Sequence, residues 1–140
     1  MYDRILLATD GSEAAESAAT EAIDIAVATG STLSVLFVAD SSVYSTVTVE
    51  GDVADVLEEE GRTVTEAIEA RAGERGVAAE STIRQGRPWR EIVAFADAID
   101  ADLIVMGSAG ESGFSRRLLG STTDRVLRET DVPVHVVPPT

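Results

Sequence analysis

Apolar positions along the chain form short, nearly continuous runs that alternate with longer segments of helical period. The runs have the length of buried β-strands and cover residues 4–9, 32–39, 77–84, 101–107 and 132–137. Segments with helical spacing of apolar residues lie between them, at 13–29, 53–74, 89–99 and 121–129. This alternation predicts an α/β fold, with an open five-stranded parallel sheet and helices on both faces. At 140 residues the chain has the length of one domain, which we expect to cover 1–140.

Local signals mark the ends of several predicted helices. Ser12 is suited to cap the first helix, Gly30 and Gly76 are suited to end the first and second, and Pro88 fits the first position of the third. Residues 40–52 are expected to form a long surface connection. The positions of the second helix expected to face inward are Val56, Val64, Ala67, Ile68 and Ala72, with Gly61 as a weak point.

Composition and charge exclude several kinds of site. The chain has no cysteine and one histidine, which removes disulfides, cysteine nucleophiles and thiolate or His-rich metal sites. A net charge of -14 argues against nucleic-acid binding, because phosphate backbones are held mainly by clustered cations. No apolar run is long enough for a membrane span. We therefore expect a cytoplasmic protein that binds neither nucleic acid nor membrane.

The eleven basic residues are all arginine. A strongly acidic chain without lysine suits a halophilic protein, because high salt screens self-repulsion while the charge maintains solubility. The same composition also fits an acidic coding bias without any such adaptation.

The segment after the fourth predicted strand, MGSAGESGFSRRLLGSTTDRVLRE at 106–129, is the best candidate for an anion site. In open parallel sheets ligands bind beyond the carboxyl ends of the strands, where the strand order reverses. Glycine lets the backbone approach an anion, and the first N–H groups of the following helix are unpaired. A phosphate is therefore expected at Gly120, Ser121 and Thr122. Alternatively, the glycines only form turns and Ser121 is only a helix cap.

Charged residues near the two candidate turns favour the later one. The turn after the first strand carries Asp10 and Glu13, which would repel a phosphate. The later segment has Arg116 and Arg117 against Glu111, although this arginine pair could equally be solvated surface.

The glycine spacing resembles that of one known family. The signature G-x-x-x-x-G-K-[ST] fails because the lysine is missing, and G-x-G-x-x-G occurs in neither turn. Gly107, Gly110, Gly120 and Ser121 instead form G-x2-G-x9-G-[ST], which resembles the nucleotide-binding universal stress proteins. The resemblance extends to RILLATDGSE, GRPWREIV and LLGSTTDRVLRETDVPVHVV, and so to nearly the whole chain.

The resemblance implies a Rossmann-like sheet of the adenine nucleotide alpha hydrolase type, with strand order 3-2-1-4-5. It also implies ATP as ligand, with Mg²⁺ carried by the phosphates. The site residues that it implies are Ala8, Thr9 and Asp10 beside adenine and ribose, Val38 at the adenine, Met106 and Gly107 at the ribose, and Gly110, Gly120, Ser121 and Thr122 around the phosphates.

The function expected from these features is nucleotide-dependent regulation in a stress response. The alternative is a dimeric interaction module that does not use nucleotide. A true enzyme has least support, because Asp10 is the only acid expected near the pocket, and it could equally open the first helix as an Asx turn. His135 lies inside the last strand, where a packed or interface role is favoured over a catalytic one. We expect no catalytic residues and at most slow ATP hydrolysis.

The last predicted strand also indicates how the protein assembles. An apolar strand at a sheet edge needs covering, and similar proteins pair through this strand as homodimers. Val134 and Val136 are therefore expected at a dimer interface, unless they only face the core.

Overall fold

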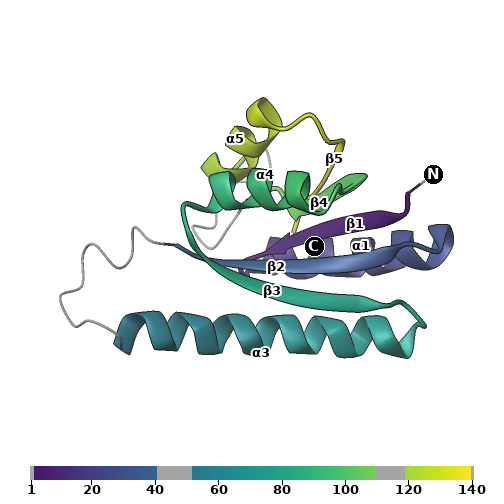
Figure 1. The fold of residues 1–140 in the computed structure, drawn as a ribbon, viewed down its shortest axis with the longest axis horizontal. Coiled ribbons are helices and arrows are strands. Elements are labelled where there is room, and N and C mark those ends of the chain that lie inside the picture. The colour runs from purple at the N-terminus through teal and green to yellow at the C-terminus, as the bar shows by residue number, and fades with distance from the viewer. Residues whose placement is uncertain (1, 41–51, 110–118, 140) are drawn as a thin grey trace.

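The computed structural model describes residues 2–40, 52–109 and 119–139 (Figure 1). Strands and helices alternate throughout this part of the chain, as predicted. None of the helices in it is long and apolar enough to cross a membrane. The elements are β1 (Arg4–Thr9), α1 (Glu13–Thr29), β2 (Thr32–Asp40), α3 (Asp52–Glu74), β3 (Ala79–Gly86), α4 (Pro88–Ala98), β4 (Leu103–Gly107), α5 (Ser121–Glu129) and β5 (Val134–Val137).

The strands form one five-stranded sheet in the order β3-β2-β1-β4-β5, and every pairing is parallel. The predicted order is thus confirmed. Ile5 in β1 is opposite Leu33 on one side and Leu103 on the other, so β1 lies at the centre. The chain first proceeds from β1 toward β3 and later from β4 toward β5. The order therefore reverses between β1 and β4, which is where a ligand crevice is expected.

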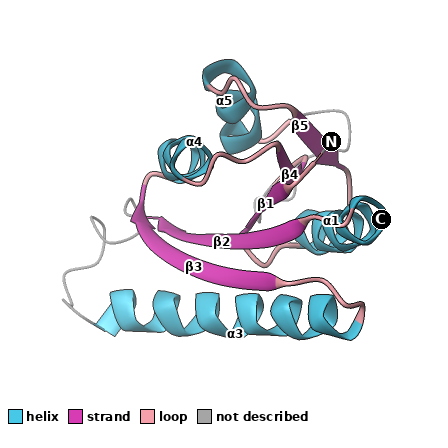
Figure 2. Ribbon diagram, turned by 45° about the vertical axis from the view of Figure 1, so that its right-hand side comes forward, coloured by secondary structure: helices cyan, strands magenta, loops and turns pink. Residues whose placement is uncertain are grey.

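Helices cover both faces of the sheet (Figure 2). On one face α1 and α3 enclose one apolar cluster, and on the other α4 and α5 enclose a second. The small side chains of α1 allow that helix to lie close to the sheet, since its alanines at 18, 19 and 22 are fully buried. The predicted caps are also present. Ser12 Oγ accepts a hydrogen bond from the Ala15 N–H, and Gly30 ends α1 in the left-handed conformation.

The inward stripe of α3 differs from the prediction. Val56 is 64% exposed and Ala67 is also exposed, whereas Thr65 and Ile68 are each 1% exposed. A Cβ at Gly61 would lie 2.6 Å from a ring carbon of Phe37, so the absence of a side chain lets α3 approach β2 there. The Thr65 hydroxyl donates to a backbone carbonyl within α3, which permits its burial. The stripe that faces the sheet is Gly61, Thr65, Ile68 and Ala72.

Strand boundaries also differ from the prediction: β2 ends one residue later, β4 begins two residues later, and β3 and β5 are shifted as follows. β3 was expected at 77–84 but spans Ala79–Gly86, because the Val77 N–H donates to the Ala72 carbonyl and closes α3. β5 was expected from 132 but begins at Val134. Pro133, which precedes it, has no N–H for the ladder and supplies only its carbonyl, to the Ile104 N–H.

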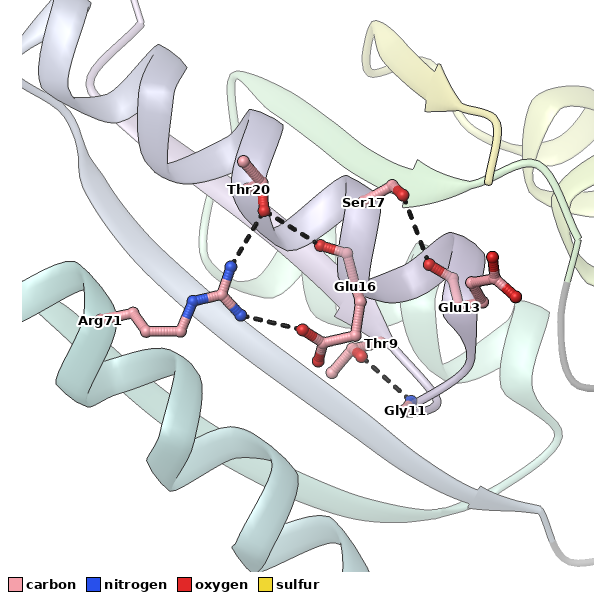
Figure 3. Close-up of polar contacts among 7 residues, drawn as sticks. All are labelled: Thr9, Gly11, Glu13, Glu16, Ser17, Thr20 and Arg71. Carbon is pink, nitrogen blue, oxygen red and sulfur yellow. Dashed lines mark hydrogen bonds and ion pairs between the residues drawn. The ribbon is translucent and has the colours of Figure 1, made fainter. Parts of the chain in front are cut away.

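Two arginines, one in the last turn of α3 and one just after it, reach across to α1 on the surface. Arg71 makes a 2.9 Å ion pair with Glu16 and donates to the Thr20 hydroxyl at 3.0 Å (Figure 3). One turn later, Arg75 pairs with Asp24 at 3.0 Å. All four charged side chains are more than a third exposed, so each pair contributes at most about 1 kcal/mol. Apolar packing on the sheet therefore determines the position of α3.

Asp102 joins the amino-terminal ends of β1 and β4. Its carboxylate accepts hydrogen bonds from the Arg4 N–H at 2.9 Å and the Asp3 N–H at 2.8 Å. Its own N–H donates to the Arg4 carbonyl at 2.8 Å. The hydrogen bonds from these two N–H groups stabilise the charged carboxylate and lower the pKa of Asp102 below its ordinary value of 3.8. The bond from Arg4 has the larger effect and the bond from Asp3 the smaller.

We expect Asp102→Asn to lower the thermal midpoint at pH 7, because the amide is a weaker acceptor for the two N–H groups. A carboxyl whose folded-state pKa is lowered stabilises the protein above the unfolded-state pKa, and the contribution is lost as the pH falls through the folded-state pKa. The difference between parent and variant should therefore be full above about pH 4 and shrink below it. Circular dichroism melts across this range test the prediction. Asp131→Asn, an exposed acid with no hydrogen bond or ion pair within the described residues, is the control. A difference in thermal midpoint between the parent and Asp102→Asn that does not change with pH would contradict the prediction.

Candidate functional site

A cavity of about 360 Å³ lies at the carboxyl ends of β1, β2 and β4 and at the start of α5. This is the point where the strand order reverses, and the volume falls within the roughly 300–1,000 Å³ of typical small-molecule sites. All the residues predicted to bind nucleotide line this cavity, except Gly110, which lies outside the described residues. Those that line it are Ala8, Thr9, Asp10, Val38, Met106, Gly107, Gly120, Ser121 and Thr122.

The turn after β1 is held by hydrogen bonds of its own side chains. Asp10 Oδ1 accepts from the Ser12 N–H at 2.9 Å. Thr9 Oγ1 accepts from the Gly11 N–H at 3.2 Å, as Figure 3 shows. Gly11 has a φ of +79°, which glycine adopts without strain. Asp10 therefore forms an Asx turn that opens α1, one of the two roles left open by the sequence.

Gly107 ends β4 against the first turn of α1. A Cβ at this position would lie 2.8 Å from the Ala14 carbonyl carbon, so a side chain would push α1 away from the sheet. On α5, the buried Thr123 hydroxyl donates to the Gly107 carbonyl at 2.8 Å. The Gly120 N–H donates to the Ser108 carbonyl, also at 2.8 Å. These contacts fasten the start of α5 to the end of β4.

The first turn of α5 presents unused donors. Gly120 is the N-cap, with no side-chain cap hydrogen bond among the described residues, so the alternative that Ser121 is only a cap is wrong. The first hydrogen bond along α5 is donated by the Asp124 N–H to the Gly120 carbonyl, at 2.9 Å. The N–H groups of Ser121 and Thr122 precede that bond and belong to residues that line the cavity. An anion here would meet backbone donors and the positive end of the helix dipole.

Several lining residues were missed by the sequence analysis. Leu57 and Glu60 come from α3, and Pro88 and Ile92 from α4. Leu57 could have been found by extending the stripe of Gly61 and Ile68 back by one turn. The remaining residues missed are Ala15, Leu36, Phe37, Ala39, Asp40, Ala109 and Thr123.

The charges around the cavity are negative. Asp10, Asp40 and Glu60 line it, and no arginine does so among the residues that the structure describes. Arg116 and Arg117, which were considered as cations for the phosphates, lie outside those residues. Within the described lining, attraction for an anion comes from the backbone of α5.

His135 lies away from the cavity. Its Nε2 is 2.9 Å from Glu21 Oε2 on α1, and its side chain is 44% exposed. His135 is thus a partly exposed surface residue, and its interface role stays a prediction.

Comparison with known proteins identifies the family. The sheet order and the position of the cavity place the chain among Rossmann-like α/β proteins, and the model of the universal stress protein family matches residues 1–138. Universal stress protein MJ0531 of Methanocaldococcus jannaschii is 37% identical over 140 aligned residues, which cover 98% of this chain and 82% of the relative. The chain belongs to the universal stress protein family.

Solved structures show the same fold. Hypothetical protein MJ0577, also of M. jannaschii, superposes with a TM-score of 0.89 at 32% identity, over 100% of this chain and 98% of that one. A universal stress protein in complex with cAMP superposes with a TM-score of 0.76 at 28% identity, over 99% of each chain.

We expect Gly107→Ala to lower the free energy of unfolding by about 1–3 kcal/mol, because the new methyl group must displace the backbone of α1. The matched control is Gly73→Ala, where a Cβ has open space within α3. That change should leave stability unchanged or raise it by less than about 1 kcal/mol. Urea denaturation of both variants measures the difference, and equal stability of the two would contradict the close approach of α1 and β4.

Proposed function

We propose that this protein binds an adenine nucleotide, ATP in particular, and that occupancy regulates its interactions in a stress response. The observation that carries the proposal is the cavity at the switch point. Residues from the ends of β1, β2 and β4 and from the start of α5, which the family resemblance implies as nucleotide-binding, line it together. A relative of 28% identity that was solved with cAMP supports an adenine nucleotide as the ligand class.

The proposed orientation follows the chemistry of the lining. The base lies at the end of β2 near Val38, and the ribose lies between Asp10 and Gly107. The phosphates lie at Ser121 and Thr122, where unpaired N–H groups and hydroxyls can donate to them. Gly110 is proposed to complete this phosphate site. A divalent cation such as Mg²⁺ is carried by the phosphates.

Binding, with at most slow hydrolysis, is the proposed activity. Hydrolysis requires a base positioned for water and a charge clamp on the transferred phosphate. Asp10 already accepts the Ser12 N–H within its turn, and His135 pairs with Glu21 away from the cavity. We further propose that residues 1–140 act as one domain in the cytoplasm, and that segments 40–52 and 108–119 transmit occupancy to partners. Most of both segments lies outside the described residues.

The first experiment is to identify nucleotide carried by the purified protein. The protein is prepared in high salt and denatured, and the released small molecules are separated by chromatography and identified by mass spectrometry. Near-stoichiometric adenine nucleotide supports the proposal. An empty protein that also fails to bind millimolar Mg-ATP would overturn it and favour an interaction module that does not use nucleotide.

We expect Ser121→Glu to weaken ATP binding by about tenfold or more, because a carboxylate beside the phosphates repels them. The same acid in the first turn of α5 favours the helix, so folding should be preserved. Titration calorimetry measures the affinity. The control is Leu127→Glu, which adds the same charge later in α5 at a side chain that is 41% exposed. Equal affinities of the two variants would place the phosphates elsewhere.

We also propose a homodimer formed through β5. This strand pairs with β4 alone in the sheet, so its outer edge is open to a second copy. Val134 contacts the core cluster beneath α4 and α5, which gives it a role in packing as well. Val136 is half-buried.

We expect Val136→Glu to raise the dimer dissociation constant at least about tenfold, because the carboxylate would be buried without a partner at the proposed dimer interface. Analytical ultracentrifugation measures the association. Val27→Glu, at an exposed position of α1, is the control and should leave it unchanged. A parent protein that stays monomeric, or a dimer unaffected by Val136→Glu, would rule out pairing through β5.

A further inference from the structure

A second hollow continues from the phosphate end of the cavity. This groove lies between the start of α4 and the length of α5 as far as Glu129, and it has a volume of about 860 Å³. It shares Asp40, Pro88, Ser121 and Thr122 with the cavity, so the two join where the phosphates are proposed to lie. The residues that line the groove alone are Arg87, Trp89, Asp124, Arg125, Arg128 and Glu129.

Arg87 is the cation of this groove that is available to a ligand. It is exposed at the N-cap of α4, and its guanidinium makes no hydrogen bond or ion pair within the described part of the chain. Arg128, in contrast, pairs with Asp124 at 3.1 Å. A guanidinium without a partner, next to the residues proposed to hold phosphate, is suited to bind a further phosphate oxygen.

Arg125 forms a flat, fixed surface in the same groove. Its guanidinium carbon lies 4.2 Å from the ring centroid of Trp89, and its Nε is 3.0 Å from Glu129 Oε2. The indole and the carboxylate thus hold the guanidinium in place while the side chain remains 48% exposed. Planar guanidinium groups and aromatic rings are the surfaces on which nucleobases stack.

We propose that the groove binds the second nucleoside of a dinucleoside polyphosphate. This inference rests on the proposed function, because the first nucleoside occupies the cavity. The polyphosphate passes Ser121 and Thr122 and meets Arg87, and the second base stacks on Arg125.

The charge of the molecule favours this small ligand over a longer polyanion. Asp124 and Glu129 neutralise the groove's paired arginines, and Asp40 lies at its junction with the cavity. With a net charge of -14, the protein repels extended nucleic acid strands. A ligand with a few phosphates between two planar bases fits one available arginine and one stacking surface.

The test compares ATP, adenosine tetraphosphate and diadenosine tetraphosphate by titration calorimetry. The two tetraphosphates have the same number of phosphates and differ by the second nucleoside and by the extra negative charge of the free terminal phosphate, which would favour adenosine tetraphosphate at Arg87. We expect diadenosine tetraphosphate to bind about five- to tenfold more tightly than adenosine tetraphosphate, because one additional base stacks on the protein.

Variants assign this preference to the groove. Arg125→Gln should abolish the preference, and Arg87→Gln should weaken both tetraphosphates while affecting ATP less. Arg75→Gln is the control, because Arg75 is exposed just after α3, pairs with Asp24 and does not line the groove. It should retain the preference.

The outcomes separate this inference from the proposed function. If ATP and both tetraphosphates bind but the second nucleoside adds no affinity, the inference alone fails. It fails also if the preference survives in Arg125→Gln. If none of the three ligands binds, the proposed function fails and the inference falls with it.

Discussion

The site depends on contacts to both sides of Gly107 at the end of β4. On one side the absence of a Cβ admits the backbone of Ala14, which brings α1 against the sheet. On the other, the Gly107 carbonyl accepts the Thr123 hydroxyl, which fixes the start of α5. Because both helices are positioned from the same residue, the turn before α1 and the donors of α5 face a common cavity. The glycine signature therefore has a structural meaning, independent of any ligand.

The fold could be predicted from the sequence because its main determinants are local. Continuous apolar runs such as residues 4–9 produce buried strands, and caps such as Ser12 and Pro88 mark the helices. The predicted stripe of α3 was right at Ile68 and Ala72, but it left out Gly61 and Thr65 because neither is apolar by type. Gly61 faces the sheet because the ring of Phe37 occupies the space that a side chain would need. Thr65 can be buried because its hydroxyl donates a hydrogen bond to a carbonyl of its own helix. Both reasons depend on structure that the sequence pattern does not contain.

The predicted site residues lie at the ends of strands or at the start of α5, whereas many of the missed residues lie inside elements, in β2, α3 and α4. Ser121 and Thr122 could be selected because a glycine before a helix identifies its amino end. Leu57, Glu60 and Ile92 line the cavity through the packing of α3 and α4 across the strands. Whether these side chains line the cavity depends on how far each helix extends beyond the sheet, and no local sequence motif indicates that length. The strand order came from the family resemblance and not from periodicity.

The two ends of the sheet are held by separate contacts. At the amino ends, Asp102 joins β4 to the start of β1 through backbone groups, and the cavity lies at the opposite ends of the same strands. The chain can therefore accept new sequences in the turns around the ligand while the register of its central strands is kept at the other end. This separation lets one scaffold diverge during evolution toward different ligands without having to rebuild its sheet.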